Sequence, residues 1–236
     1  MLTIEEINRY SRQLMQQEIG LEGQLKLKAA KVMVIGAGGL GCPVLQYLAG
    51  AGLGTISIVD FDTIEIHNLH RQILYTPADV GKKKPIIAAE KLNQLNPHCH
   101  INSYDVLLNE ENVETLIADH DLVIDGSDNF NTRYIVNDAC VRMGKPLVYG
   151  SILNFEGQIA VFNYKGSKNL RDLYPQAPDP EDVPSCSENG VLGIVPGVIG
   201  TMMCGIGLNI ILEKNVNINS LLLCDLNSYS LRSISY

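Results

Sequence analysis

A short apolar run followed by closely spaced glycines constrains the fold of this chain more than any other stretch. Residues 31–35 read Lys-Val-Met-Val-Ile and lead into a loop that contains Gly36, Gly38, Gly39 and Gly41. The apolar run predicts a buried parallel strand, and the glycines let the backbone turn sharply and approach a ligand. Residues 40–51 then predict a helix, and because its first-turn N–H groups face the loop, we expect an anion there.

A second apolar strand, residues 55–59, ends in Asp60. An acidic residue at this distance from a glycine loop accepts hydrogen bonds from ribose hydroxyls in nucleotide-binding folds. The glycine spacing alone often marks only a tight turn. Its position between a strand and a helix makes a nucleotide site the better interpretation.

Composition limits the class of protein. The length of 236 residues fits one α/β domain, and the formal charge of −8 argues against a nucleic-acid or anionic-membrane partner. The first residues are acidic where a signal peptide would be basic. The cysteines are far apart and form no C-x-x-C pair, which predicts reduced thiols in the cytoplasm and no zinc site.

The N-terminal segment predicts an amphipathic helix. Residues 3–6 form a capping box, after which Ile4, Ile7 and Leu14 are expected to face inward. Arg12 lies on the opposite, polar face, and such a face is on its own most often a solvated surface.

A dense polar segment, residues 61–72, follows Asp60 where open α/β sheets place their ligands. His67 and His70 have a spacing that could bind a metal, but two histidines without a third ligand are more often structural. Asn68, Arg71 and Gln72 are better candidates for phosphate or ribose contacts. The lysine run that ends at Lys84 is either solvated surface or the source of an ammonium group for phosphates.

Strands and helices continue to alternate as far as residue 143, which predicts a parallel sheet with right-handed crossovers. The strand at 121–125 runs into Gly126-Ser127-Asp128-Asn129, and a helix follows at 130–143. Asp125 and Asp128 therefore flank the end of a strand close to the expected phosphates. One of them could be a Mg²⁺ ligand, or Asp128 could only cap the helix; the spacing leaves both open.

The pattern changes after Pro146. Residues 147–154 and 158–164 predict a hairpin, residues 165–189 a long mobile loop with Cys186 near its end, and the last two strands are expected at 220–224 and 229–235. Residues 190–212 are long and apolar enough for a membrane span. Because glycines and a proline interrupt them and no basic flank accompanies them, a buried or interfacial helix is the better interpretation.

These motifs together resemble the HesA/MoeB/ThiF family, the bacterial relatives of ubiquitin-activating enzyme. The resemblance rests on Arg9-Tyr10-Ser11-Arg12-Gln13, the glycine loop, Asp60, Asn68-Leu69-His70-Arg71-Gln72, Lys84 and Asp125-Gly126-Ser127-Asp128-Asn129. It implies one adenylating domain over residues 1–236, with a Rossmann-like α/β fold: a mixed sheet, mostly parallel with antiparallel C-terminal strands, and helices on both faces. It also implies a homodimer that uses ATP and Mg²⁺ to adenylate the C-terminal glycine of a ubiquitin-fold sulfur carrier ending in Gly-Gly, for thiamine or molybdenum cofactor biosynthesis.

The resemblance also implies residue roles. Asp60 would bind the ribose, Asp128 the Mg²⁺, and Arg12 would reach the ATP of the partner subunit. Nucleotide contacts are expected from Gly36, Gly38, Gly39, Gly41, Asp60, Asp62, Asn68, Arg71, Gln72, Lys84, Asp128 and Asn129. Catalytic roles are expected for Arg12, Arg71, Lys84, Asp128 and Cys186, the last in sulfur transfer with a sulfurtransferase or cysteine desulfurase as a further partner.

Three departures and alternatives remain. The two C-x-x-C pairs that bind zinc in many family members are absent, so zinc is not expected. An NAD-dependent oxidoreductase would use the same glycine loop and Asp60, although the second half offers no clear general acid beside a substrate-binding arginine. A non-catalytic scaffold that binds a ubiquitin-fold partner is the third possibility.

Overall fold

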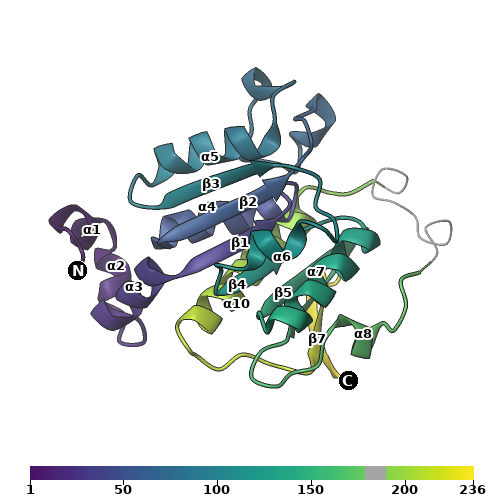
Figure 1. Ribbon diagram of the computed structural model, residues 1–236. Coiled ribbons are helices and arrows are strands. Elements are labelled where there is room, and N and C mark those ends of the chain that lie inside the picture. The colour runs from purple at the N-terminus through teal and green to yellow at the C-terminus, as the bar shows by residue number, and fades with distance from the viewer. Residues whose placement is uncertain (179–189) are drawn as a thin grey trace.

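The fold is a single mixed sheet with helices on both faces, seen in a computed structural model that describes residues 1–178 and 190–236 (Figure 1). The strand order within these residues is β3-β2-β1-β4-β5-β6-β7-β8, parallel from β3 to β5 and antiparallel from β5 to β8. The strands are β1 Lys31–Ile35, β2 Thr55–Asp60, β3 His100–Asp105, β4 Leu122–Asp125, β5 Leu147–Leu153, β6 Glu156–Phe162, β7 Ser220–Asp225 and β8 Ser230–Ser235. The predicted fold class is confirmed.

The helices are short at the N-terminus and longer against the sheet. The described α-helices are α1 Ile4–Arg9, α2 Ser11–Leu14, α3 Gly20–Ala29, α4 Gly41–Ala51, α5 Lys84–Leu95, α6 Val113–Ile117, α7 Phe130–Met143, α8 Leu170–Leu173 and α10 Ile194–Ile211. Two 3₁₀ turns, η1 Ile66–Asn68 and η2 Pro77–Asp79, lie between β2 and α5.

Alternation along the strands divides the core into two layers. In β1, Val32 and Val34 belong to the cluster that includes α4, α5 and α10, whereas Met33 and Ile35 belong to the cluster that includes α6 and α7. All four side chains are at most 3% exposed. The apolar run is thus a strand buried on both faces, as a parallel sheet requires.

The glycine loop turns so tightly that one of its glycines has no room for a side chain. A Cβ on Gly41 would lie 1.9 Å from the carbonyl oxygen of Gly36. Gly36 itself has φ +87°, a value that favours glycine. The first turn of α4 therefore packs directly on the end of β1.

We expect Gly41→Ala to lower the free energy of unfolding by about 2–3 kcal/mol, because the new methyl group must displace backbone. Urea denaturation of the purified protein measures this. Gly50→Ala is the matched control in the same helix, since a Cβ there meets nothing within 4 Å. An unchanged urea midpoint for Gly41→Ala would contradict the packing described here.

The N-terminal helix does not face the core as predicted. Its capping box is present, but Ile4 is 78% exposed and Ile7 45% exposed, while Glu6 is 3% exposed. Glu6 is buried because its carboxylate accepts from Thr3 N and lies 2.7 Å from Lys28 Nζ. The expected inward apolar face is therefore wrong for Ile4 and Ile7, and these side chains lie on the surface.

The segment 165–189, predicted as a long mobile loop, contains a short helix. The short helix α8 is capped by Asn169, and its Leu170 is only 2% exposed. Arg171 forms an ion pair with Asp138 of α7 at 2.7 Å. Residues 169–174 therefore contact α7. Residues 179–189, with Cys186, lie outside the described part of the chain, and the mobility of the loop stays a prediction.

Helix α10 is the long apolar segment. Its 18 residues have a mean hydropathy of 1.9, so by length and composition it could cross a membrane. In the folded protein, however, 44% of the helix is buried. It packs against α4 and β5, where a Cβ on Gly150 would lie 2.2 Å from Met203 Sδ. Its outer face, which includes Val198, Met202 and Ile206, is only half-buried.

Candidate functional site

A cavity of about 470 Å³ lies at the carboxyl ends of β1, β2 and β4. Chain connections run from β1 toward β2 on one side, while β4 lies on the other side of β1, so the strand order reverses here. Open α/β sheets bind ligands at this reversal. Backbone N–H groups of Gly36 and Gly126 donate to the ends of β2 and β1, which fixes both loops around the opening.

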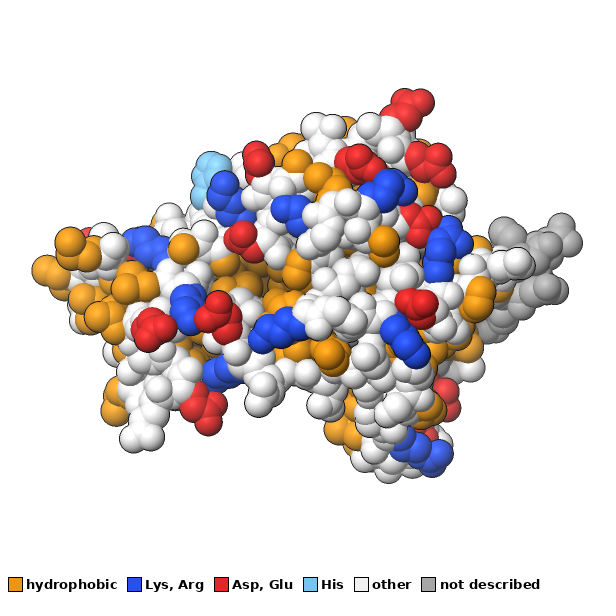
Figure 2. Space-filling view, turned by 60° about the horizontal axis from the view of Figure 1, so that its bottom comes forward, with side chains coloured by type: hydrophobic (Ala, Val, Ile, Leu, Met, Phe, Trp, Pro, Cys, Tyr) orange, Lys and Arg blue, Asp and Glu red, His pale blue; other side chains and the backbone are white. Residues whose placement is uncertain are grey.

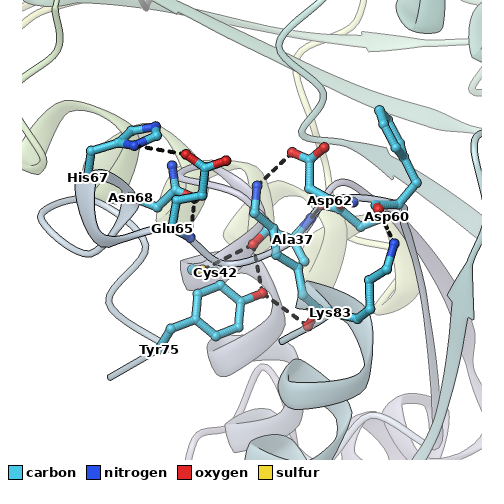
Figure 3. A network of polar contacts seen from close by, with 11 residues as sticks. Ala37, Cys42, Asp60, Asp62, Glu65, His67, Asn68, Tyr75 and Lys83 are labelled. Carbon is cyan, nitrogen blue, oxygen red and sulfur yellow. Dashed lines mark hydrogen bonds and ion pairs between the residues drawn. The ribbon is translucent and has the colours of Figure 1, made fainter. Parts of the chain in front are cut away.

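Asp60 is bonded directly to the glycine loop. Its Oδ2 accepts from Ala37 N at 2.7 Å and its Oδ1 accepts from Asp62 N at 2.8 Å (Figure 3). Burial raises the pKa of Asp60, while the nearby Lys84 charge opposes that shift. The two backbone hydrogen bonds fix the orientation of the Asp60 carboxylate at the cavity wall. A residue that binds ribose hydroxyls needs such a fixed orientation.

Cationic and amide groups stand on the side of the cavity formed by residues 61–84. Lys84 is 4% exposed, and its Nζ lies 2.7 Å from Asp62 Oδ2. Arg71 donates to the carbonyl of His67 at 3.0 Å and makes no carboxylate ion pair within the described residues. Gln72 is 3% exposed, and its Oε1 has no partner in the described structure. A buried amide oxygen without a partner, on a cavity wall, indicates room for a ligand donor.

Helix α4 adds a positive end. It begins at Gly41 without a side-chain cap. The N–H of Cys42 donates to the carbonyl of Gly38 at 2.9 Å, that of Val44 donates to Leu40, and Pro43 has no N–H, so the helix offers an anion the positive end of its dipole more than free first-turn donors. Helix α10 approaches the same loop, because a Cβ on Gly39 would lie 3.1 Å from Pro196. The glycine at position 39 thus allows the two helices to enclose the loop.

The structure separates the two acidic residues after β4. Asp125 is 1% exposed, its Oδ1 accepts from Ser127 N at 2.9 Å, and burial raises its pKa. Asp128 is exposed and lines the cavity. The helix cap is Asn129, whose side chain accepts from Thr132 N at 2.9 Å. The alternative that Asp128 caps α7 is therefore wrong.

The donor set suits magnesium. Mg²⁺ binds proteins through one or two carboxylates together with substrate phosphates and water. Asp128 offers one exposed carboxylate on the cavity wall. Elsewhere in residues 1–178 and 190–236, no three His, Cys, Asp or Glu side chains are grouped closely enough to hold a metal, and His67 instead pairs with Glu65 at 3.1 Å.

Some predicted site residues are not on the cavity wall. Asn68 is buried, and its Oδ1 accepts from Glu65 N at 3.1 Å in the η1 turn. Gly41 serves loop packing. Arg12 is exposed on α2, and its Nη1 contacts Met15 Sδ at 3.7 Å. Cys186 lies outside the described residues. Those that do line the cavity are Gly36, Gly38, Gly39, Asp60, Asp62, Arg71, Gln72, Lys84, Asp128 and Asn129.

Other residues of the site were not predicted. Tyr75 lies beneath the loop and donates to the carbonyl of Ala37 at 2.9 Å (Figure 3). Ser127 and Arg133 line the cavity beside Asp128, and residues 106–108 supply an apolar wall. Arg133 stands four residues after Asn129 and thus one helical turn into α7, a spacing that could have indicated it.

The five described thiols should react slowly with alkylating reagents. All are buried, and burial raises the pKa of Cys42, Cys140 and Cys204 to about 12 and of Cys99 to about 11. We expect native protein to incorporate at most one iodoacetamide rapidly, at Cys186, because thiolates are the reactive form. Peptide mass mapping measures this, and rapid labelling of any buried thiol in folded protein would contradict it.

Comparisons with known proteins identify the family and agree with the fold. A sequence model described as the ThiF family matches residues 10–236. The sulfur carrier protein adenylyltransferase of Thermus thermophilus is 48% identical over 215 residues, which cover 89% of this chain and 79% of that protein. Adenylyltransferase and sulfurtransferase MOCS3 of Anopheles gambiae is 47% identical over 234 residues, 99% of this chain and 53% of that protein. The chain spans about half the length of that relative.

Solved structures share the architecture. The crystal structure of E. coli MccB with ATP matches with a TM-score of 0.84 and 24% sequence identity, over 97% of this chain and 71% of that one. The structure of PaaA matches with a TM-score of 0.83 and 20% identity, over 99% of this chain and 74% of that one. At these identities the likeness concerns the fold alone.

Proposed function

This chain belongs to the ThiF family, and from that premise we propose that it is an adenylyltransferase that activates a ubiquitin-fold sulfur-carrier protein. In the reaction, one oxygen of the carrier's C-terminal carboxylate attacks the α-phosphorus of ATP. The bond from that phosphorus to the bridging oxygen breaks, pyrophosphate leaves, and an acyl-adenylate forms.

The observation that carries this proposal is the composition of one cavity. Asp60, held at the glycine loop, stands on the same cavity as Arg71, Lys84 and Asp128. A carboxylate that approaches ATP is repelled by a centre that is already negative, so fixed cations and backbone donors must neutralise the phosphates. Lys84, Arg71 and the start of α4 supply those groups here.

Asp128 is the residue that would hold Mg²⁺, since Asp125 is buried behind the loop and bonded to Ser127 N. When bound, the ion supplies positive charge to the phosphate oxygens. Lys84 lies on the cavity wall and pairs with Asp62, and its ammonium has further N–H groups that can donate to a phosphate.

Three measurements, of pyrophosphate exchange, thermal stabilisation and carrier binding, separate this function from the two alternatives. We expect the protein to catalyse exchange of labelled pyrophosphate into ATP only when a carrier ending in Gly-Gly is present. Thermal stabilisation by NAD but not by ATP would favour an oxidoreductase. Carrier binding without exchange would favour a non-catalytic scaffold. The names of the curated relatives support the adenylyltransferase.

We also propose that the active unit is a homodimer. Figure 2 shows hydrophobic side chains gathered at the end of the molecule that carries the N-terminal helices. Ile4, Met15 and Leu21 are all more than half exposed, and the outer face of α10 is half-buried. Apolar surface of this kind favours a subunit interface. Arg12 stands on α2 and does not line the cavity of its own chain, which supports the proposal that it serves the site of a partner subunit.

The finer assignments extend the same proposal. The carrier that the protein adenylates would supply sulfur for thiamine or molybdenum cofactor biosynthesis. Cys186 would take part in sulfur transfer, with a sulfurtransferase or cysteine desulfurase as a further partner. In that case Cys186→Ala keeps pyrophosphate exchange. The acidic net charge and the buried, reduced cysteines support a cytoplasmic protein without a nucleic-acid or membrane partner.

We expect the purified protein to fold without zinc, because the sequence has no C-x-x-C pair. Elemental analysis should find less than one zinc per chain, and a chelator should leave the thermal unfolding midpoint unchanged. Structural zinc contributes directly to folding, so one tightly held zinc, or unfolding on chelation, would overturn this expectation.

A further inference from the structure

Three buried polar atoms without partners meet at the end of β4. They are Asp125 Oδ2, Ser127 Oγ and Arg133 Nε, and no hydrogen-bond partner for any of them occurs in the described structure. The three residues are 1%, 8% and 6% exposed. Ser127 and Arg133 line the cavity, and Asp125 lies behind them. Because buried polar groups are nearly always hydrogen-bonded, the two unpartnered atoms on the cavity wall indicate a place for a polar ligand.

Arg133 contributes the positive charge of this cluster. Its guanidinium lies 5.1 Å from the ring centre of Phe130 and 5.6 Å from that of Tyr149, and its Nη2 donates to the carbonyl of Ser127 at 3.0 Å. Within residues 1–178 and 190–236 the arginines that form ion pairs are Arg142 and Arg171. Arg133 forms none, although its charge acts on the buried Asp125 carboxylate and opposes the rise that burial causes in the pKa of that acid. A fixed, buried guanidinium without an ion-pair partner is suited to bind a further anion, and its planar fork matches a carboxylate.

The position of Arg133 distinguishes it from the phosphate-binding cations. Arg71 and Lys84 come from the segment after β2, whereas Arg133 comes from α7, next to Asp128. The cavity wall continues from Arg133 along β5 and β6 through Ser151, Ile152 and Gln158. An extended peptide that enters along these strands would bring its last residue toward Arg133 and Asp128, which line the same cavity.

We propose that Arg133, with the Ser127 hydroxyl as a second donor, binds the C-terminal carboxylate of the incoming carrier tail and positions it for attack. This inference rests on the proposed function and adds to it the residue that recognises the free acid. The guanidinium is a binding group in the cavity; the attacking oxygen remains the one of the carboxylate that points toward the α-phosphorus.

The test compares two forms of the carrier with two forms of the enzyme. The probes are two ubiquitin-fold sulfur carriers ending in Gly-Gly, one used in thiamine biosynthesis and one in molybdenum cofactor biosynthesis. Each is prepared with a free C-terminal acid and with a C-terminal amide. We expect the unaltered enzyme to bind the acid about 10- to 100-fold more tightly than the amide, the range of a hydrogen bond to a charged group. Arg133→Gln should bind both forms equally, with its affinity for ATP unchanged.

Further variants keep the result interpretable. Arg133→Lys retains the charge without the fork, so it should preserve part of the preference for the acid even if Arg133→Gln folds poorly. Arg142→Gln removes an exposed arginine of the same helix that pairs with Glu114, and it should keep the full preference. Thermal unfolding of each variant verifies folding.

The outcomes separate the two proposals. A preference for the acid that persists in Arg133→Gln, or its absence in the unaltered enzyme, overturns the role of Arg133. If the unaltered enzyme prefers the acid through Arg133 but never exchanges pyrophosphate, the carboxylate site stands and the proposed adenylation fails. If no carrier binds in either form, both proposals are overturned.

Discussion

Asp128→Ala is expected to lower carrier-dependent pyrophosphate exchange by at least about 10³-fold, because it removes the exposed carboxylate that would hold the metal on the phosphates. ATP-induced thermal stabilisation without Mg²⁺ should change little, since the loop, Asp60 and Lys84 remain. Isotope exchange measures the first effect and differential scanning fluorimetry the second.

Asp119→Ala is the control for this substitution. Asp119 is an exposed aspartate in the turn after α6 and does not line the cavity. Its removal should leave exchange within about twofold, the scale of surface substitutions. Equal activity of the Asp128 and Asp119 variants would mean that the metal is held elsewhere, and Asp125→Asn would then become the variant to measure.

Arg12→Ala is expected to lower exchange by about 10³-fold, the lower end of the effect of an arginine finger supplied by another subunit. The proposed dimer should persist, because the apolar surface that would form the interface is unaltered. Analytical ultracentrifugation measures the association, and isotope exchange measures the activity. Arg9→Ala is the matched control, since Arg9 donates to the carbonyl of Leu95 in its own chain.

Mixing the Arg12→Ala and Asp128→Ala proteins tests which subunit Arg12 serves. If Arg12 acts on the partner's site, each mixed dimer contains one site with both residues intact. Random exchange in an equal mixture then restores about a quarter of the unaltered activity. If subunits exchange, as a tagged pull-down can demonstrate, but activity does not return, Arg12 serves its own subunit or none.

Local sequence patterns were sufficient for the order of strands and helices and for one half of the site. The apolar run before Gly36 predicted a strand buried on both faces, and the position of the glycines between that strand and a helical pattern predicted a helix start; the structure has both. Asp60 was predictable for the same reason, since it ends the next strand. Lys84 was predictable only as one of two alternatives, because a lysine run is usually solvent-exposed.

Tertiary packing decided the rest, since it depends on contacts between residues far apart in the sequence. Spacing could not choose between Asp125 and Asp128; the turn at Ser127 buries the first and exposes the second. In the N-terminal helix Ile4 and Ile7 are exposed and Glu6 is buried, the opposite of the expected arrangement. Glu6 can be buried because Lys28 compensates its charge. The guanidinium of Arg133, which lines the cavity, lies against the ring of Tyr149 in β5. No local pattern connects that residue of β5 with α7. Thus periodicity and glycine placement determined the framework, whereas the side chains that complete the cavity were determined by which strands and helices the fold brings together.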